Sequence, residues 1–182
     1  MAAERTLWLS PRGGHSNGTD DAAAASGHDD LMTREPFFTI GYEGTTPSAF
    51  AAALENAGVD LLVDVRAVAA SRRPGFSKGA LSASVNSQGI GYVHLRALGT
   101  PKEGREAARS GDAAGLTRIY GAHLQTDPAK AALQELKDLA SGRRICLLCF
   151  ERHVEGCHRL LIADWLCEQI DAEPTHLMPA PF

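Results

Sequence analysis

From residue 37 onward, the hydrophobic pattern consists of short apolar runs separated by longer amphipathic segments. Such runs, bounded by glycine, serine or charged residues, are typical of buried strands. The predicted strands are Phe37–Ile40, Leu61–Arg66, Tyr92–Leu95, Ile145–Phe150 and Thr175–Met178. The run LLVDVR at Leu61–Arg66 is of the nearly continuous kind found in parallel sheets, which are covered on both faces.

The segments between these runs carry apolar residues at the three- and four-residue spacing of helices. Helices are expected over residues 47–57, 78–88, 116–123, 127–140 and 160–166. Thr46 before Pro47 is a typical helix start, because threonine caps free N–H groups and proline has none to satisfy. Strands that alternate with helices predict an α/β fold: a single three-layer domain with a mostly parallel sheet and helices on both faces, rhodanese-like or Rossmann-like in arrangement.

Two segments depart from this pattern. Residues 1–35 are dominated by Gly, Ser, Ala and Asp without sustained apolar spacing, which predicts a disordered N-terminal tail before a single α/β domain at 36–182. Residues 96–112 form a polar stretch with Gly and Pro breaks. Long loops in compact domains are often functional, so we expect a loop of the lid type there.

The composition is that of one ordinary globular domain, with 182 residues, 44% of them hydrophobic, and a formal net charge of -4. A slightly acidic chain has no overall attraction to nucleic acid or anionic lipid, although a local basic groove is compatible with that sum. No apolar stretch reaches the length of a membrane span, so no membrane partner is expected. The four cysteines all lie in the last third of the chain, which favours the reducing cytoplasm over a secreted disulfide framework.

The densest chemistry lies in the segment Arg143–Leu166, where a predicted strand, a polar loop and a predicted helix follow one another. Ligands of α/β proteins bind at such junctions, because the helix N-terminus presents free N–H groups at the carboxyl end of the strand. Eleven consecutive residues contain Cys149, Glu151, His153, Cys157, His158 and Arg159. A plain connection does not need so many reactive side chains.

Three interpretations of this loop stay open. In the first, Cys149 or Cys157 is a nucleophilic thiolate beside basic groups. Glu151 or His153 then transfers protons. In the second, Arg159 and the helix N–H groups bind a phosphate or carboxylate without covalent chemistry. In the third, a metal ion is bound by Cys149, His153, Cys157 and His158. The cofactor is left open, and a metal is the less favoured choice because the spacing is not that of a dedicated structural site.

Asp64 and Arg66 lie two residues apart on a predicted strand, so their side chains share one face. They either form a buried ion pair or line the same crevice as the Cys149 loop. We favour the crevice, because a carboxylate inside an apolar strand is costly unless it is used.

A basic loop follows that strand, with Arg72, Arg73 and Lys78 around Phe76. Such a loop can bind a nucleic-acid backbone while the aromatic ring stacks on a base. The simpler interpretation is a solvated loop whose Phe76 packs into the core, and the loop alone favours this interpretation.

Four motifs together resemble one known family: Thr39–Tyr42, LLVDVR with Ser71–Arg73, Tyr92–Leu95 with Leu98–Gly99, and LLCFE with the later CHRLLIADWL. The chain resembles the domain of unknown function 488 family over about residues 37–178. The resemblance implies an α/β fold with a site of polar residues, and it does not supply a reaction. Many members have His where Tyr42 stands, and many have Pro after the DVR strand, where this chain has Ala67–Ala70. A role for that His is therefore not transferred.

The expected function is that of a small cytoplasmic enzyme acting on an anionic small molecule, either phosphorylated, a nucleotide or sulfur-bearing. The catalytic candidates are Asp64, Cys149, Glu151 and Cys157, and the substrate-binding candidates are Tyr42, Arg66, Arg73, His158 and Arg159. The alternatives are a non-catalytic module that binds nucleotides or nucleic acid, and a metal-binding or redox-sensing protein. The oligomeric state is left open.

Overall fold

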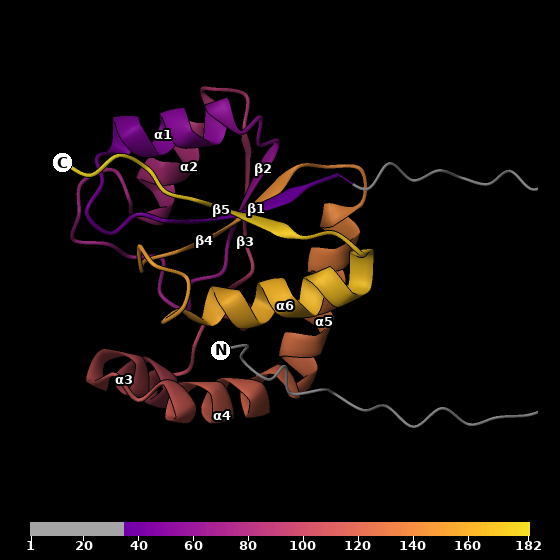
Figure 1. Ribbon diagram of the computed structural model, residues 1–182. Helices are drawn as coiled ribbons and strands as arrows, with labels where there is room; N and C mark the ends of the chain where they lie inside the picture. Colours follow the sequence, from indigo (N-terminus) through magenta and orange to yellow (C-terminus); the bar gives the residue numbers. More distant parts are fainter. Residues whose placement is uncertain (1–34) are drawn as a thin grey trace, which may run out of the picture. The chain divides into compact units, whose positions relative to one another are not determined.

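A five-stranded sheet is the centre of the computed structural model, which describes residues 35–182 (Figure 1). Its strands are β1 (Phe37–Gly41), β2 (Leu61–Asp64), β3 (Gly91–His94), β4 (Ile145–Cys149) and β5 (Pro174–Leu177). They lie in the order β3-β2-β4-β1-β5, and all neighbouring strands are parallel. The predicted α/β fold with a mostly parallel sheet is confirmed.

Helices cover both faces of this sheet, as predicted (Figure 1). Helices α1 and α2 lie on one face, and α5 and α6 lie on the other. Helix α4 packs against α5 and α6, and α3 packs against α4. The helices are α1 (Pro47–Asn56), α2 (Lys78–Asn86), α3 (Lys102–Ser110), α4 (Ala113–Leu124), α5 (Asp127–Ala140) and α6 (His158–Ile170), with a 3-10 turn η1 at Arg96–Leu98.

The alternation of side chains along the strands divides the core into two parts. Val63 of β2 and Leu147 of β4 belong to the part under α4, α5 and α6. Leu62 and Leu148 belong to the part under α1 and α2. Because successive side chains of a strand point to opposite faces, a residue's position in its strand decides which layer it meets.

The helix ends follow the local chemistry of the sequence. Thr46 caps α1, because its Oγ1 accepts a hydrogen bond from the backbone N of Ala49 at 3.2 Å. Helix α5 spans residues 127–140 as predicted. Helix α6 begins at His158 and is longer than the predicted 160–166, so Cys157 is its N-cap residue.

The predicted long loop at residues 96–112 is wrong, because this segment contains η1 and the helix α3. The sequence of α3, KEGREAARS, is rich in good helix formers, with Glu103 in the first turn and Arg109 in the last turn, where their charges complement the helix dipole. Ala107 is buried on the side that meets α4. The polar composition reflects the exposed face of a helix and not an irregular lid.

The prediction of a disordered tail at residues 1–35 falls, apart from Glu35, outside the described residues. Among the residues that the structure describes, no helix is both long and apolar enough to cross a membrane.

Candidate functional site

The β4–α6 loop lies at the carboxyl edge of the sheet, where successive connections diverge. Strand β4 lies between β1 and β2. The connection after β1 leads to α1 on one face, whereas the connection after β4 leads to α6 on the other. In open α/β sheets, ligands bind in the crevice that such a divergence leaves. Cys149 ends β4 and Cys157 caps α6, so both lie at this crevice.

The thiol groups of Cys149 and Cys157 meet at one carboxylate oxygen. Their Sγ atoms lie 2.9 Å and 3.1 Å, respectively, from Oε2 of Glu151. Burial raises the pKa of the Cys157 thiol well above its ordinary value. Burial would also raise the pKa of Glu151, but hydrogen bonds from Cys149 and Cys157 outweigh it and lower that pKa. An ionised carboxylate therefore accepts hydrogen bonds from two thiols.

His158, in the first turn of α6, faces both sulfur atoms. Its Nδ1 lies 3.6 Å from Sγ of Cys149 and 3.8 Å from Sγ of Cys157. Its Nε2 lies 3.0 Å from the carbonyl oxygen of Val65, which only accepts hydrogen bonds, so Nε2 carries the hydrogen. In the neutral ring, Nδ1 then carries no hydrogen, and its lone pair is directed at the two sulfur atoms. Cys149, Glu151, Cys157 and His158 together form a thiol cluster.

Arg159 holds the loop that carries this cluster. Its side chain is only 1% exposed. It donates to the carbonyl oxygens of Glu151 and Arg152, the second at 3.0 Å, and to Oγ1 of Thr39 at 3.3 Å. It also donates to Sγ of Cys157 at 3.6 Å. All three guanidinium nitrogens bond to the protein, so the arrangement favours a positioning role over the predicted anion binding.

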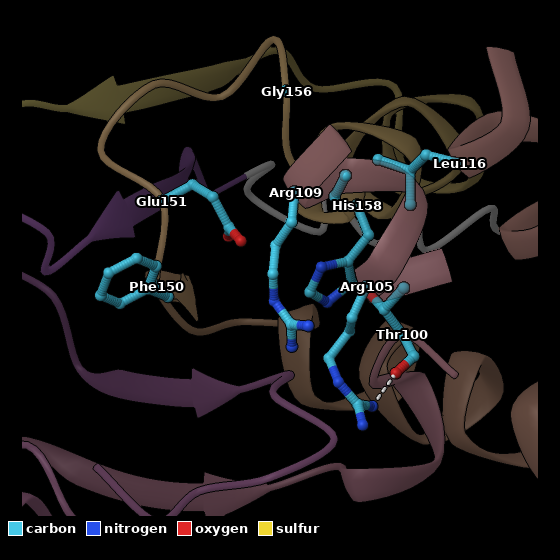
Figure 2. Close-up of a pocket in the computed structure, with 9 residues that line it drawn as sticks. Thr100, Arg105, Arg109, Leu116, Phe150, Glu151, Gly156 and His158 are labelled. Carbon is cyan, nitrogen blue, oxygen red and sulfur yellow. Dashed lines mark hydrogen bonds between the residues drawn. The ribbon is translucent and has the colours of Figure 1, made fainter. Parts of the chain in front are cut away.

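A cavity of about 420 Å³ opens beside the cluster, between the β4–α6 loop and α3 (Figure 2). Glu151 and His158 form part of its wall, and the carboxylate of Glu151 points into the space between the loop and α3. Arg105 and Arg109 extend from α3 in the same direction, and Arg105 donates to the carbonyl oxygen of Thr100 at 2.6 Å. The other residues of the wall are Ala108, Leu116, Phe150 and Gly156.

Asp64 and Arg66 lie on the opposite side of the sheet, towards α1 and α2, and are not part of this wall. Arg66 donates to both carboxylate oxygens of Asp64, through Nε at 2.8 Å and Nη2 at 2.6 Å. The hydroxyl of Tyr92 donates to Asp64 at 2.6 Å, and the guanidinium of Arg66 lies 5.1 Å from the ring centroid of Tyr42. The structure therefore shows the buried ion pair, and not a carboxylate in the Cys149 crevice.

The basic loop after β2 offers no free aromatic face. Phe76 is 1% exposed and stacks on Tyr42 with 4.5 Å between ring centroids. Arg73 donates to the carbonyl oxygen of Thr45 at 2.8 Å. The simpler interpretation, in which Phe76 packs into the core, describes this loop.

Three other residues of the predicted site region lie apart from the cluster. His153 is exposed and is not among the converging side chains. Cys146 is fully buried in the core under α1 and α2, and Cys167 is partly exposed on α6. The potential metal ligands are thus Cys149, Cys157 and His158, whose ligand atoms all lie within 4.8 Å of one another.

The basic residues of the cavity, Arg105 and Arg109, are not among the site residues predicted from the sequence. They lie four residues apart, and side chains at this spacing share one face of a helix. A loop was predicted at 96–112, and a loop does not place these two side chains on one face. The run of Glu, Ala and Arg in KEGREAAR was the available signal.

One comparison with known proteins gives a match. A family model described as "Domain of unknown function DUF488" matches residues 46–166. No curated protein and no solved structure matches the chain. The rhodanese-like or Rossmann-like arrangement therefore stays a prediction.

Proposed function

This chain belongs to the DUF488 family, and we propose that it is a small enzyme that binds an anionic small molecule in the cavity between α3 and the β4–α6 loop. The thiol cluster would act on the bound molecule. One observation carries this proposal: two arginines line the same cavity as a carboxylate and an imidazole that are in contact with two thiols. Convergent polar groups in a concave site are the usual mark of an active site.

The basic wall supports an anionic ligand. Arg105 and Arg109 lie on one face of α3, and guanidinium groups bind phosphates and carboxylates through paired hydrogen bonds. The cavity volume of about 420 Å³ lies in the range of sites for small molecules. A strand of nucleic acid would need a longer basic groove, and the buried Phe76 removes the stacking face predicted for it.

The cluster supports chemistry on that ligand by proton transfer or group transfer. The carboxylate of Glu151 and the ring of His158 are the members of the cluster that reach the cavity wall. Glu151 would be the proton-transferring group, and Arg105 and Arg109 would bind the anion. A cytoplasmic location fits this proposal, because reducing conditions keep all four cysteines as free thiols.

Titration calorimetry with inorganic phosphate tests the basic wall. We expect Arg109→Gln to weaken phosphate binding by about ten-fold, the loss of one charged hydrogen bond. Arg118→Gln, which removes an exposed arginine from α4, is the matched control and should leave binding unchanged. Equal losses in both variants, or no binding to the unmodified protein, would contradict the proposed anion site.

Activity is tested with a panel of phosphate, carboxylate and sulfate esters. We expect turnover of one class, a higher KM in Arg109→Gln, and a lower kcat in Glu151→Gln. A kcat that Glu151→Gln leaves unchanged would exclude the proposed proton transfer.

A further inference from the structure

Four potential ligand atoms converge on one point in the thiol cluster: two Sγ atoms, Nδ1 of His158 and Oε2 of Glu151. We propose that Cys149, Cys157 and His158 bind a divalent ion of the zinc type, with Glu151 as an exchangeable fourth ligand on the side of the cavity that leaves the ion when it transfers a proton. This inference concerns the same site and rests on the proposed function for the role of the ion. Metal content and anion binding are measured separately, so the proposed metal site and the proposed anion site can be contradicted independently.

The separations between the atoms fit a tetrahedral site. Zinc–sulfur and zinc–nitrogen bonds of about 2.3 Å and 2.0 Å place sulfur and nitrogen about 3.5 Å apart across a tetrahedral angle. The two sulfur–Nδ1 separations are 3.6 Å and 3.8 Å. Oε2 of Glu151 is 2.9 Å and 3.1 Å from the sulfurs, somewhat closer than about 3.5 Å, and rotation about the last side-chain bond of Glu151 changes this readily.

Two acceptors, Glu151 and His158, share the two thiol hydrogens of the cluster. Each thiol has one hydrogen, and both thiols lie at hydrogen-bonding distance from Oε2 of Glu151. Nε2 of His158 keeps its hydrogen for Val65, so in the neutral ring Nδ1 is a second acceptor, and a thiol that donates to it gives up its bond to Glu151. A cation at the centre would satisfy all four groups together.

The surroundings also match those of metal ligands. A ligating histidine usually donates its other ring N–H to a carbonyl or carboxylate, which fixes the ring, and His158 donates to Val65 at 3.0 Å. Arg159 lies 3.6 Å from Sγ of Cys157, where its N–H group can stabilise a thiolate. Backbone and side-chain partners therefore hold two of the ligands in place.

The total charge of the cluster is the same without and with a bound metal ion. With neutral thiols and a neutral imidazole, the charges are those of the ionised Glu151 and of Arg159, whose guanidinium donates to the backbone carbonyl of Glu151, and they sum to zero. Binding of a divalent ion releases the two thiol protons to solvent, so two thiolates neutralise the ion and the total charge of the cluster stays the same. Sulfur and imidazole ligands select zinc and related ions over magnesium and calcium, which prefer oxygen.

The first experiment uses the unmodified full-length chain, purified without chelators. Elemental analysis should find about one zinc-type ion per chain, and Co²⁺ added to the stripped protein should give thiolate-to-cobalt charge-transfer absorption. Bound Zn²⁺ should also protect Cys149 and Cys157 from alkylation, as mapped by mass spectrometry, while Cys167 stays equally reactive. Absence of stoichiometric metal after reloading, or unchanged alkylation of Cys149 and Cys157, would overturn the proposal.

The second experiment compares cysteine variants. Cys149→Ala and Cys157→Ala should each lower Zn²⁺ affinity by at least about 100-fold, beyond the losses usual for residues that only support ligands. Cys167→Ala, on the same helix as His158 but outside the cluster, should keep the affinity of the unmodified protein. Equal effects in all three variants would count against the assigned ligands. Phosphate binding to the metal-free protein, compared with its Arg109→Gln variant, then shows separately whether the anion site exists.

Discussion

At the scale of single residues, the site depends on a close contact between β1 and the β4–α6 loop. Gly41, the last residue of β1, pairs with Cys149 at the end of β4. A Cβ atom at Gly41 would overlap the carbonyl oxygen of Glu151 and come within 3.0 Å of Nη1 of Arg159. Glycine at this position therefore lets Arg159 hold the loop against the strand.

We expect Gly41→Ala to destabilise the fold by about 1–3 kcal/mol, because the added methyl group overpacks the contact with the loop. Gly121→Ala is the matched control, because beyond the adjacent backbone of α4 no atom lies within 4 Å of its new Cβ, and alanine favours the helix by about 0.5–1 kcal/mol. Urea denaturation of both variants measures the difference. Equal stability of the two variants would show that the loop does not rest on Gly41.

At the scale of elements, α3 carries the basic wall of the cavity. The sequence indicated the other five helices through their apolar spacing, but α3 has few apolar residues and packs chiefly through Gly104 and Ala107. Small buried residues leave a weak hydrophobic pattern, and the Gly and Pro breaks in 96–112 hid the helix further. The arginines were visible in the sequence, but their common direction was not.

Proline substitutions distinguish a helix from a loop at this position. Ala107→Pro should cost about 3 kcal/mol or more, because proline removes an internal hydrogen bond and clashes with the preceding turn. It should also weaken phosphate binding, because Arg109 follows two residues later. Lys102→Pro is the control at the first helical position, where Pro101 is already extended with φ -60 and ψ 163. Thermal unfolding and calorimetry of the two variants should differ; similar losses would argue against a helical α3.

At the scale of the whole molecule, the strand order brings distant segments to one crevice. β4 inserts between β1 and β2, so Val65 after β2, Gly41 of β1 and the loop after β4 meet. The cluster therefore joins three strands and α6. A ligand bound there stabilises the native state relative to the unfolded chain.

Zinc should raise the thermal stability of the stripped protein. A free concentration 100-fold above the Kd contributes about 2.7 kcal/mol, which corresponds to roughly 5–10 °C in Tm for a chain of this size. Scanning calorimetry with and without Zn²⁺ measures this shift. Cys149→Ala should show no comparable shift, and an equal rise in that variant would point to zinc bound elsewhere.

The parallel α/β architecture, the five strands and the location of the loop with Cys149 and Cys157 were predictable from the sequence. These features follow from local rules: apolar runs mark buried strands, and Cys149, Glu151, Cys157 and His158 are close in the chain. The shared face of Asp64 and Arg66 was also predictable from the local sequence, because side chains two residues apart on a strand point the same way.

The layer that each polar group meets depends on tertiary packing. Asp64 and Cys149 lie at the ends of adjacent strands, but their side chains point to opposite faces, so Asp64 pairs with Arg66 while Cys149 meets the cluster. Arg105 and Arg109 likewise line the same cavity as Glu151 because α3 packs on α4. Strand order, register and helix packing are non-local, and periodicity along one segment does not contain them.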